Sequence, residues 1–92
     1  MNKNKIAIES LSMDLMRVAM GYHRGSLKMA ERFSDEAISR INEIEKSKIK
    51  PYFVKILKNL QSILLKKDRS IIADDILMYS VLCKNYAKKY LD

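Results

Sequence analysis

The chain of 92 residues has little of what turns, crosslinks and metal sites require: two glycines, one proline, one cysteine and one histidine, and no tryptophan. A β-sheet fold needs a turn signal about every ten residues, so the scarcity of glycine and proline excludes one. A single cysteine excludes an intramolecular disulfide, and one cysteine with one histidine cannot form a Cys/His zinc site. We therefore expect one all-α domain over residues 1–92, without a metal or cofactor.

Long apolar runs are also absent. No run approaches the roughly 20 residues that a transmembrane helix requires. The basic start of the chain is followed by an apolar stretch that Glu9 and Asp14 interrupt, which is not typical of a secretory signal peptide. We expect a cytoplasmic protein without a membrane partner. Hydrophobic residues make up 48% of the chain, which is enough for a core.

What the first half of the sequence does contain is helical periodicity. From Leu11 to Ile44, apolar residues recur at spacings of three and four. This pattern predicts one long, largely continuous helix over residues 6–46. The alternative is a break near Gly21–Ser26 or at Ser34, a serine followed by two acidic residues that resembles a helix start. Gly21 and Gly25 favour a close helix crossing, with a kink or a ligand contact as the other interpretations.

The second half predicts two more helices. Residues 46–50 form the connection, and Pro51 suits the first turn of a helix that ends around Lys66–Lys67. Asp68 or Ser70 can cap a third helix that runs to about Leu91. The sequence therefore predicts a small antiparallel bundle of three helices in an up-down-up arrangement.

Two of these helices carry more apolar surface than a three-helix monomer can cover. The third helix is apolar nearly all round, and the first has two apolar stripes, one of them rich in methionine. We expect self-association, or docking into a larger assembly. The residues assigned to the oligomer interface are Met13, Met16, Met20, Ile72, Ile76, Tyr79, Cys83 and Tyr86.

The formal net charge of +7 comes from one quarter of the chain. Residues 1–45 and 70–92 are each neutral, whereas residues 46–69 hold eight basic residues and one acidic residue. Lysines opposite the apolar face of the second helix suit phosphate contacts and do not suit base reading. The alternative is a lysine-rich face that only keeps the helix soluble. The candidate nucleic-acid-binding residues are Lys46, Lys48, Lys50, Lys55, Lys58, Lys66, Lys67 and Arg69, with Arg17, Arg24 and Lys28 of the first helix.

Arg17 and His23 carry the one pattern that suggests catalysis. Five residues separate them, and this spacing resembles the arginine–histidine motif of HEPN-type ribonucleases. The resemblance implies a helical RNA-cleaving protein with these two residues in its active site. Val18 follows the arginine, at a place where that family usually has a polar residue. A histidine at the edge of the core is the favoured interpretation.

These features favour a small, basic, non-catalytic helical subunit that self-associates and binds RNA or DNA through its backbone phosphates. By analogy of size, charge and helicity, it resembles accessory components of larger nucleoprotein assemblies, such as CRISPR effectors and reverse-transcriptase complexes. Two alternatives stay open. One is an adaptor whose basic helix docks an acidic protein partner, and the other is the HEPN-like ribonuclease. We assign no catalytic residue.

Overall fold

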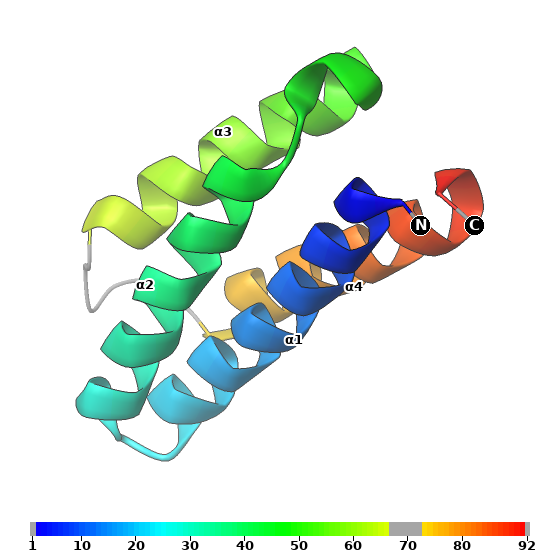
Figure 1. The fold of residues 1–92 in the computed structure, drawn as a ribbon. Coiled ribbons are helices and arrows are strands. Elements are labelled where there is room, and N and C mark those ends of the chain that lie inside the picture. The colour runs from blue at the N-terminus through cyan, green and yellow to red at the C-terminus, as the bar shows by residue number, and fades with distance from the viewer. Residues whose placement is uncertain (1, 67–72, 92) are drawn as a thin grey trace.

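The computed structural model describes residues 2–66 and 73–91, and every regular element in those ranges is helical. The elements are α1 (Lys3–His23), α2 (Leu27–Glu43), the short 3-10 helix η1 (Lys46–Lys48), α3 (Pro51–Lys66) and α4 (Ala73–Tyr90). Successive α-helices run in opposite directions, so the two ends of the chain lie near one another (Figure 1). The all-α prediction is confirmed. The prediction of three helices is wrong, because the described chain forms four α-helices.

The fourth helix arises because the expected long first helix is interrupted. Gly25 has a φ of +71°, a left-handed conformation that ends helices and favours glycine. Ser26 then caps α2, since its hydroxyl accepts a hydrogen bond from the N–H of Met29 at 3.3 Å. The alternative of a break near Gly21–Ser26 is therefore confirmed. Ser34, the other candidate, is buried inside α2.

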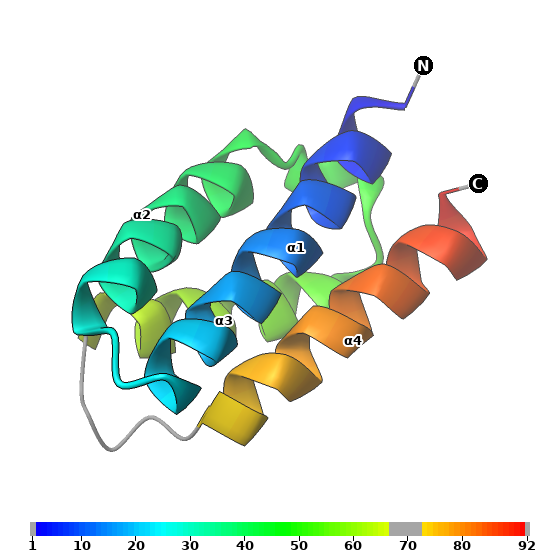
Figure 2. The same cartoon turned by 90° about the horizontal axis from the view of Figure 1, so that it is seen from below.

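Helix α1 lies at the centre of the bundle. It packs against α2 on one side and α4 on the other, and α3 packs against α2 across the back of this layer (Figures 1 and 2). All four helices contribute to one core, whose largest fully buried side chains include Leu11 and Leu15 of α1, Ile41 of α2, Phe53, Leu57 and Leu60 of α3, and Ile76 of α4. The predicted start of α3 at Pro51 and its end at Lys66 are confirmed.

Small residues allow α1 to approach both neighbours closely. A Cβ atom at Gly21 would lie 2.7 Å from the backbone nitrogen of Ala30, so α2 packs directly on the α1 backbone at this point. On the other side, the hydroxyl of Ser12 donates to the carbonyl oxygen of Ser80 at 2.8 Å, and the hydroxyl of Ser80 donates to the carbonyl oxygen of Ser12 at 2.7 Å. The close crossing predicted from the glycines is confirmed at Gly21, whereas Gly25 forms the turn.

Candidate nucleic-acid interface

The candidate lysines of the second predicted helix lie on the solvent side of α3. One side of this helix faces the core through Phe53, Leu57, Leu60 and Leu64. The opposite side exposes three lysines, Lys55, Lys58 and Lys66, which we call the lysine row. None of the ion pairs found in the described part of the chain involves the lysine row. Helix α3 itself contains no acidic residue.

Long-range hydrogen bonds fix the chain where it enters α3. Asn4, at the start of α1, binds the backbone of Glu45: its Nδ2 donates to the carbonyl oxygen at 3.0 Å, and its Oδ1 accepts from the N–H at 2.9 Å. The N–H of Lys50 donates to the hydroxyl oxygen of Tyr86 on α4 at 2.9 Å. The lysines at positions 46, 48 and 50 therefore extend from an anchored backbone.

These connection lysines are exposed, but each has a contact within the chain. The contacts are the carbonyl oxygen of Ile41 for Lys46, the carboxylate of Glu45 at 3.5 Å for Lys48, and the ring centre of Tyr90 at 4.8 Å for Lys50. Exposed ion pairs contribute little to stability, so a phosphate can replace the contact between Lys48 and Glu45 at small cost. Among the described basic residues from Lys46 to Lys66, those of the lysine row have no ion pair, hydrogen bond or ring contact of this kind.

The three cations predicted from the first helix do not join this surface. Arg17 is held between α1 and α2, where its guanidinium lies 5.4 Å from the ring centre of Phe33. Arg24 and Lys28 flank the α1–α2 turn, at the opposite end of the bundle from the connection into α3 (Figure 1). Arg24 and Lys28 therefore lie far from Lys46, Lys48 and Lys50, although the C-terminal end of α3 lies at the same end of the bundle as the α1–α2 turn (Figure 1). Lys67 and Arg69 lie outside the residues that the structure describes.

Arg17 takes part in a charged cluster that the sequence did not reveal. Asp14 is only 4% exposed; its Oδ1 lies 3.5 Å from Nη1 of Arg17, and its Oδ2 lies 3.7 Å from Nε of Arg40. Burial, and then the nearby charge of Glu36, raise the pKa of Asp14, while Arg40 and Arg17 act in the opposite direction. Within the described residues, neither Oδ2 of Asp14 nor Nε of Arg40 makes a hydrogen bond.

The residues of the HEPN-like pattern point to different sides of α1. Arg17 contacts Asp14 and Phe33 on the side of α2. His23 is exposed at the end of the helix, and its Nε2 lies 3.8 Å from Oδ1 of Asp74 on α4. A single copy of the chain therefore does not bring the arginine and the histidine together.

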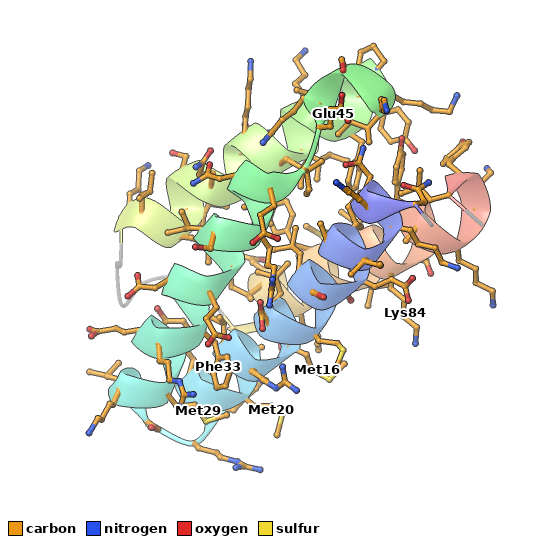
Figure 3. All side chains as sticks on the ribbon, in the orientation of Figure 1. Met16, Met20, Met29, Phe33, Glu45 and Lys84 are labelled. Carbon is orange, nitrogen blue, oxygen red and sulfur yellow. The ribbon has the colours of Figure 1, made fainter. Side chains whose placement is uncertain are left out.

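The predicted interface residues of α1 are exposed, whereas those of α4 are largely buried. Met13 and Met16 are 54% and 45% exposed, and Met20 is exposed beside them. Figure 3 shows Met16 and Met20 with Met29 and Phe33 of α2 at the end of the bundle where the α1–α2 turn lies. Because Met13, Met16 and Met20 follow helical spacing, they form one continuous strip, which we call the methionine strip.

The assignment of Ile76, Cys83 and Tyr86 to an oligomer interface needs correction. All three are buried in the core of a single chain, and burial raises the pKa of the Cys83 thiol to about 12. They are therefore not available to a second copy. Tyr79 is partly buried against the same core, and Ile72 lies outside the described residues. The apolar side chains that α4 exposes are Leu77, Met78, Val81 and Leu82.

An aromatic cluster joins the first turn of α3 to the last turns of α4. Tyr86 stacks on Phe53, with ring centres 3.9 Å apart and 8° between the planes. Tyr52 and Tyr90 flank Tyr86, with ring centres 6.0 and 5.0 Å from it. The signal for this cluster in the sequence is that aromatic residues occur at the start of one helix and at the end of the next. In an antiparallel bundle these two ends lie opposite each other. Spacing within separate helices does not reveal it.

No family model matches the chain, and no curated protein or solved structure is significantly similar to it. None of the helices described is both long enough and apolar enough to cross a membrane. The evidence for function therefore comes from the geometry and charge of the residues themselves.

Proposed function

We propose that this protein binds RNA or DNA through backbone phosphates on the lysine row of α3, as a non-catalytic, self-associating subunit of a larger nucleoprotein assembly. The main support is the concentration of the net charge on the connection and α3, where Lys55, Lys58 and Lys66 have no acidic partner in the described chain. A polyanion is the natural counterpart of such a surface.

Like charges on one helix face also make an anionic partner favourable. Lys55 and Lys58 are three residues apart and therefore repel each other. Acidic residues that commonly relieve such repulsion on soluble helices are missing from α3. Phosphates along a strand would supply the compensating charge, and the exposed side chains of Asn59 and Ser62 would add neutral hydrogen-bond donors beside it.

Self-association is the second part of the proposal, and the methionine strip carries it. Met13, Met16 and Met20 are apolar side chains exposed on the outer side of α1. Glu9, one turn before Met13, is exposed, and Arg17, next to Met16, is partly exposed, so charged groups border the strip. An exposed apolar strip with a charged border suits a two-fold contact between two copies of α1.

The binding proposal is tested by removing the lysine row. The triple variant Lys55→Gln, Lys58→Gln, Lys66→Gln is compared with wild type by fluorescence anisotropy on a labelled duplex of about 30 base pairs. Loss of three phosphate contacts at low salt is expected to weaken binding by about tenfold or more. The matched control, Lys3→Gln, Lys84→Gln, Lys88→Gln, removes the same charge elsewhere and is expected to change affinity much less.

Equal weakening by both triple variants would contradict the assignment to α3 and indicate a diffuse charge effect. Absence of binding by the wild-type protein to duplex and single strand at low salt would contradict the proposal as a whole. If the protein is instead an adaptor for an acidic protein partner, we expect that the wild-type protein does not bind nucleic acid.

A further inference from the structure

The aromatic cluster between α3 and α4 opens to solvent as a shallow pocket of about 140 Å3. Tyr52 and Tyr90 form its exposed walls, at 50% and 40% exposure, and the buried ring of Tyr86 forms its floor. The lining is completed by Phe53, Ile56, Leu82, Asn85 and Lys89. Sites for whole small-molecule ligands usually span about 300–1,000 Å3, so this pocket suits a single ring system.

The floor of the pocket is rigid. Tyr86 is fixed on one face by the stacked ring of Phe53. Its hydroxyl oxygen accepts the hydrogen bond from the N–H of Lys50, which ties the floor to the connection. An incoming ring therefore meets a preformed aromatic surface, and little ordering is needed on binding.

Cations surround the pocket. The Nζ of Lys50 lies 4.8 Å from the ring centre of Tyr90, and the Nζ of Lys89 lies 5.3 Å from it. A hydrogen bond with Lys89, and then one with Tyr52, lower the pKa of Tyr90. Aromatic pockets elsewhere bind cationic groups, but two ammonium groups at this rim repel a cationic ligand. The ligand that fits is a flat ring next to negative charge.

The pocket is also continuous with the lysine row. Tyr52 and Lys55 are three residues apart on α3, so they are neighbours on one helix face. A strand that follows the lysine row therefore reaches the pocket within one helical turn.

We propose that this pocket receives one unpaired nucleobase of single-stranded RNA or DNA, stacked against the exposed rings of Tyr52 and Tyr90, with Lys50 and Lys89 next to the flanking phosphates. Asn85, which is exposed at the rim, offers an amide to the edge of the base. This inference rests on the proposed function and adds to it a preference for single strands. The paired bases of a duplex are stacked inside the helix, so they cannot enter the pocket.

The test compares three labelled ligands at one low salt concentration: oligo(dT), oligo(rU) and a duplex of similar length. Stacking on an aromatic side chain accounts for roughly a 5- to 150-fold difference in affinity on alanine substitution. We expect Tyr52→Ala and Tyr90→Ala to weaken single-strand binding by at least about fivefold, and to leave duplex binding within about twofold of wild type. The DNA and RNA arms show which strand is preferred.

Two control variants separate stacking from other effects. Tyr52→Phe keeps the ring and is expected to bind single strands like wild type. Leu65→Ala removes an exposed apolar side chain from α3 outside the pocket and is expected to change neither affinity. Circular dichroism checks that each variant remains helical. If a Tyr→Ala variant fails this check, a strand containing 2-aminopurine reports stacking on the wild-type protein directly, through quenching of its fluorescence.

The outcomes distinguish this inference from the proposed function. Duplex binding that depends on the lysine row, together with single-strand binding that ignores the tyrosine substitutions, overturns the pocket and leaves the proposed function standing. Unquenched 2-aminopurine in a bound strand also overturns the pocket. Failure of all three ligands to bind overturns both.

Discussion

Two glycines in the α1–α2 hairpin perform different tasks at the scale of single residues. Gly21 permits contact with the α2 backbone, since a Cβ there would lie 2.7 Å from the nitrogen of Ala30. Gly25 has open space around it but a φ of +71°. A close approach between helices and a left-handed turn both favour glycine. The sequence therefore indicates that positions 21 and 25 are structurally important, but it does not show which glycine has which role.

Substitution of either glycine is expected to destabilise the fold, for different reasons. Gly21→Ala overpacks the hairpin at a cost of about 1–3 kcal/mol, partly offset by about 1 kcal/mol from the better helix propensity of alanine. Gly25→Ala strains the backbone by about 1–2 kcal/mol, and Gly25→Asn is milder because asparagine tolerates this conformation. Urea unfolding measures all three variants. A higher midpoint for Gly21→Ala would contradict the close contact.

Asp14 is expected to make the free energy of unfolding depend on pH. Its folded-state pKa is raised above the ordinary value of 3.8, first by burial. Its protonated form is thus favoured in the folded protein, and this stabilisation is lost as pH rises through the folded-state pKa. Asp14→Asn keeps a neutral side chain at every pH. The free energy of unfolding of this variant, relative to wild type, is therefore expected to increase as pH rises from the ordinary pKa of 3.8 through the folded-state pKa of Asp14.

Thermal or urea unfolding of wild type and Asp14→Asn in parallel measures this difference, since the other titrating groups act similarly in both proteins. A relative stability that falls as pH rises would show that Arg17 and Arg40 dominate the environment of Asp14.

Among the helices, the fourth helix explains why the apolar stripe of α4 is buried in the core and does not form an exposed interface. The sequence correctly identifies the stripe through Ile76, Cys83 and Tyr86 as an apolar face of its helix. In a bundle of only three helices, too few helices would lie next to this stripe to bury it. With α1 and α2 separated at Gly25, α4 packs against α1 and meets the first turn of α3 as well. The stripe therefore lies in the core, and the surface left over is that of the methionine strip and the outer side of α4.

The methionine strip is expected to mediate self-association. Wild-type protein at micromolar concentration is expected to sediment as a dimer or higher oligomer in analytical ultracentrifugation. Met13→Glu with Met16→Glu places like charges in the methionine strip, and this double variant is expected to sediment as a monomer. The control pair, Lys28→Glu with Glu31→Gln at the start of α2, lies outside the strip and is expected to leave the oligomer intact. A monomeric wild type would contradict self-association.

For the whole molecule, the position of the charge is predictable from the sequence, but the shape of the site is not. Counting acidic and basic residues along the chain finds the surface of α3, because neighbours in sequence stay neighbours on one helix. The turn at Gly25 places Arg24 and Lys28 at the opposite end of the bundle from the connection lysines, and Arg17 contacts Asp14 and Phe33. The aromatic pocket depends on the pairing of Tyr52 with Tyr90 across two helices, which only the folded arrangement reveals.

The salt dependence of binding is a direct measure of phosphate recognition by the lysine row. If the wild-type protein contacts about four to six phosphates, log K is expected to fall against log[salt] with a slope of about −4 to −5 on duplex DNA. The Lys55→Gln, Lys58→Gln, Lys66→Gln variant is expected to have a slope shallower by about two to three. A wild-type slope near zero, or a variant slope equal to that of wild type, would contradict phosphate binding by the lysine row.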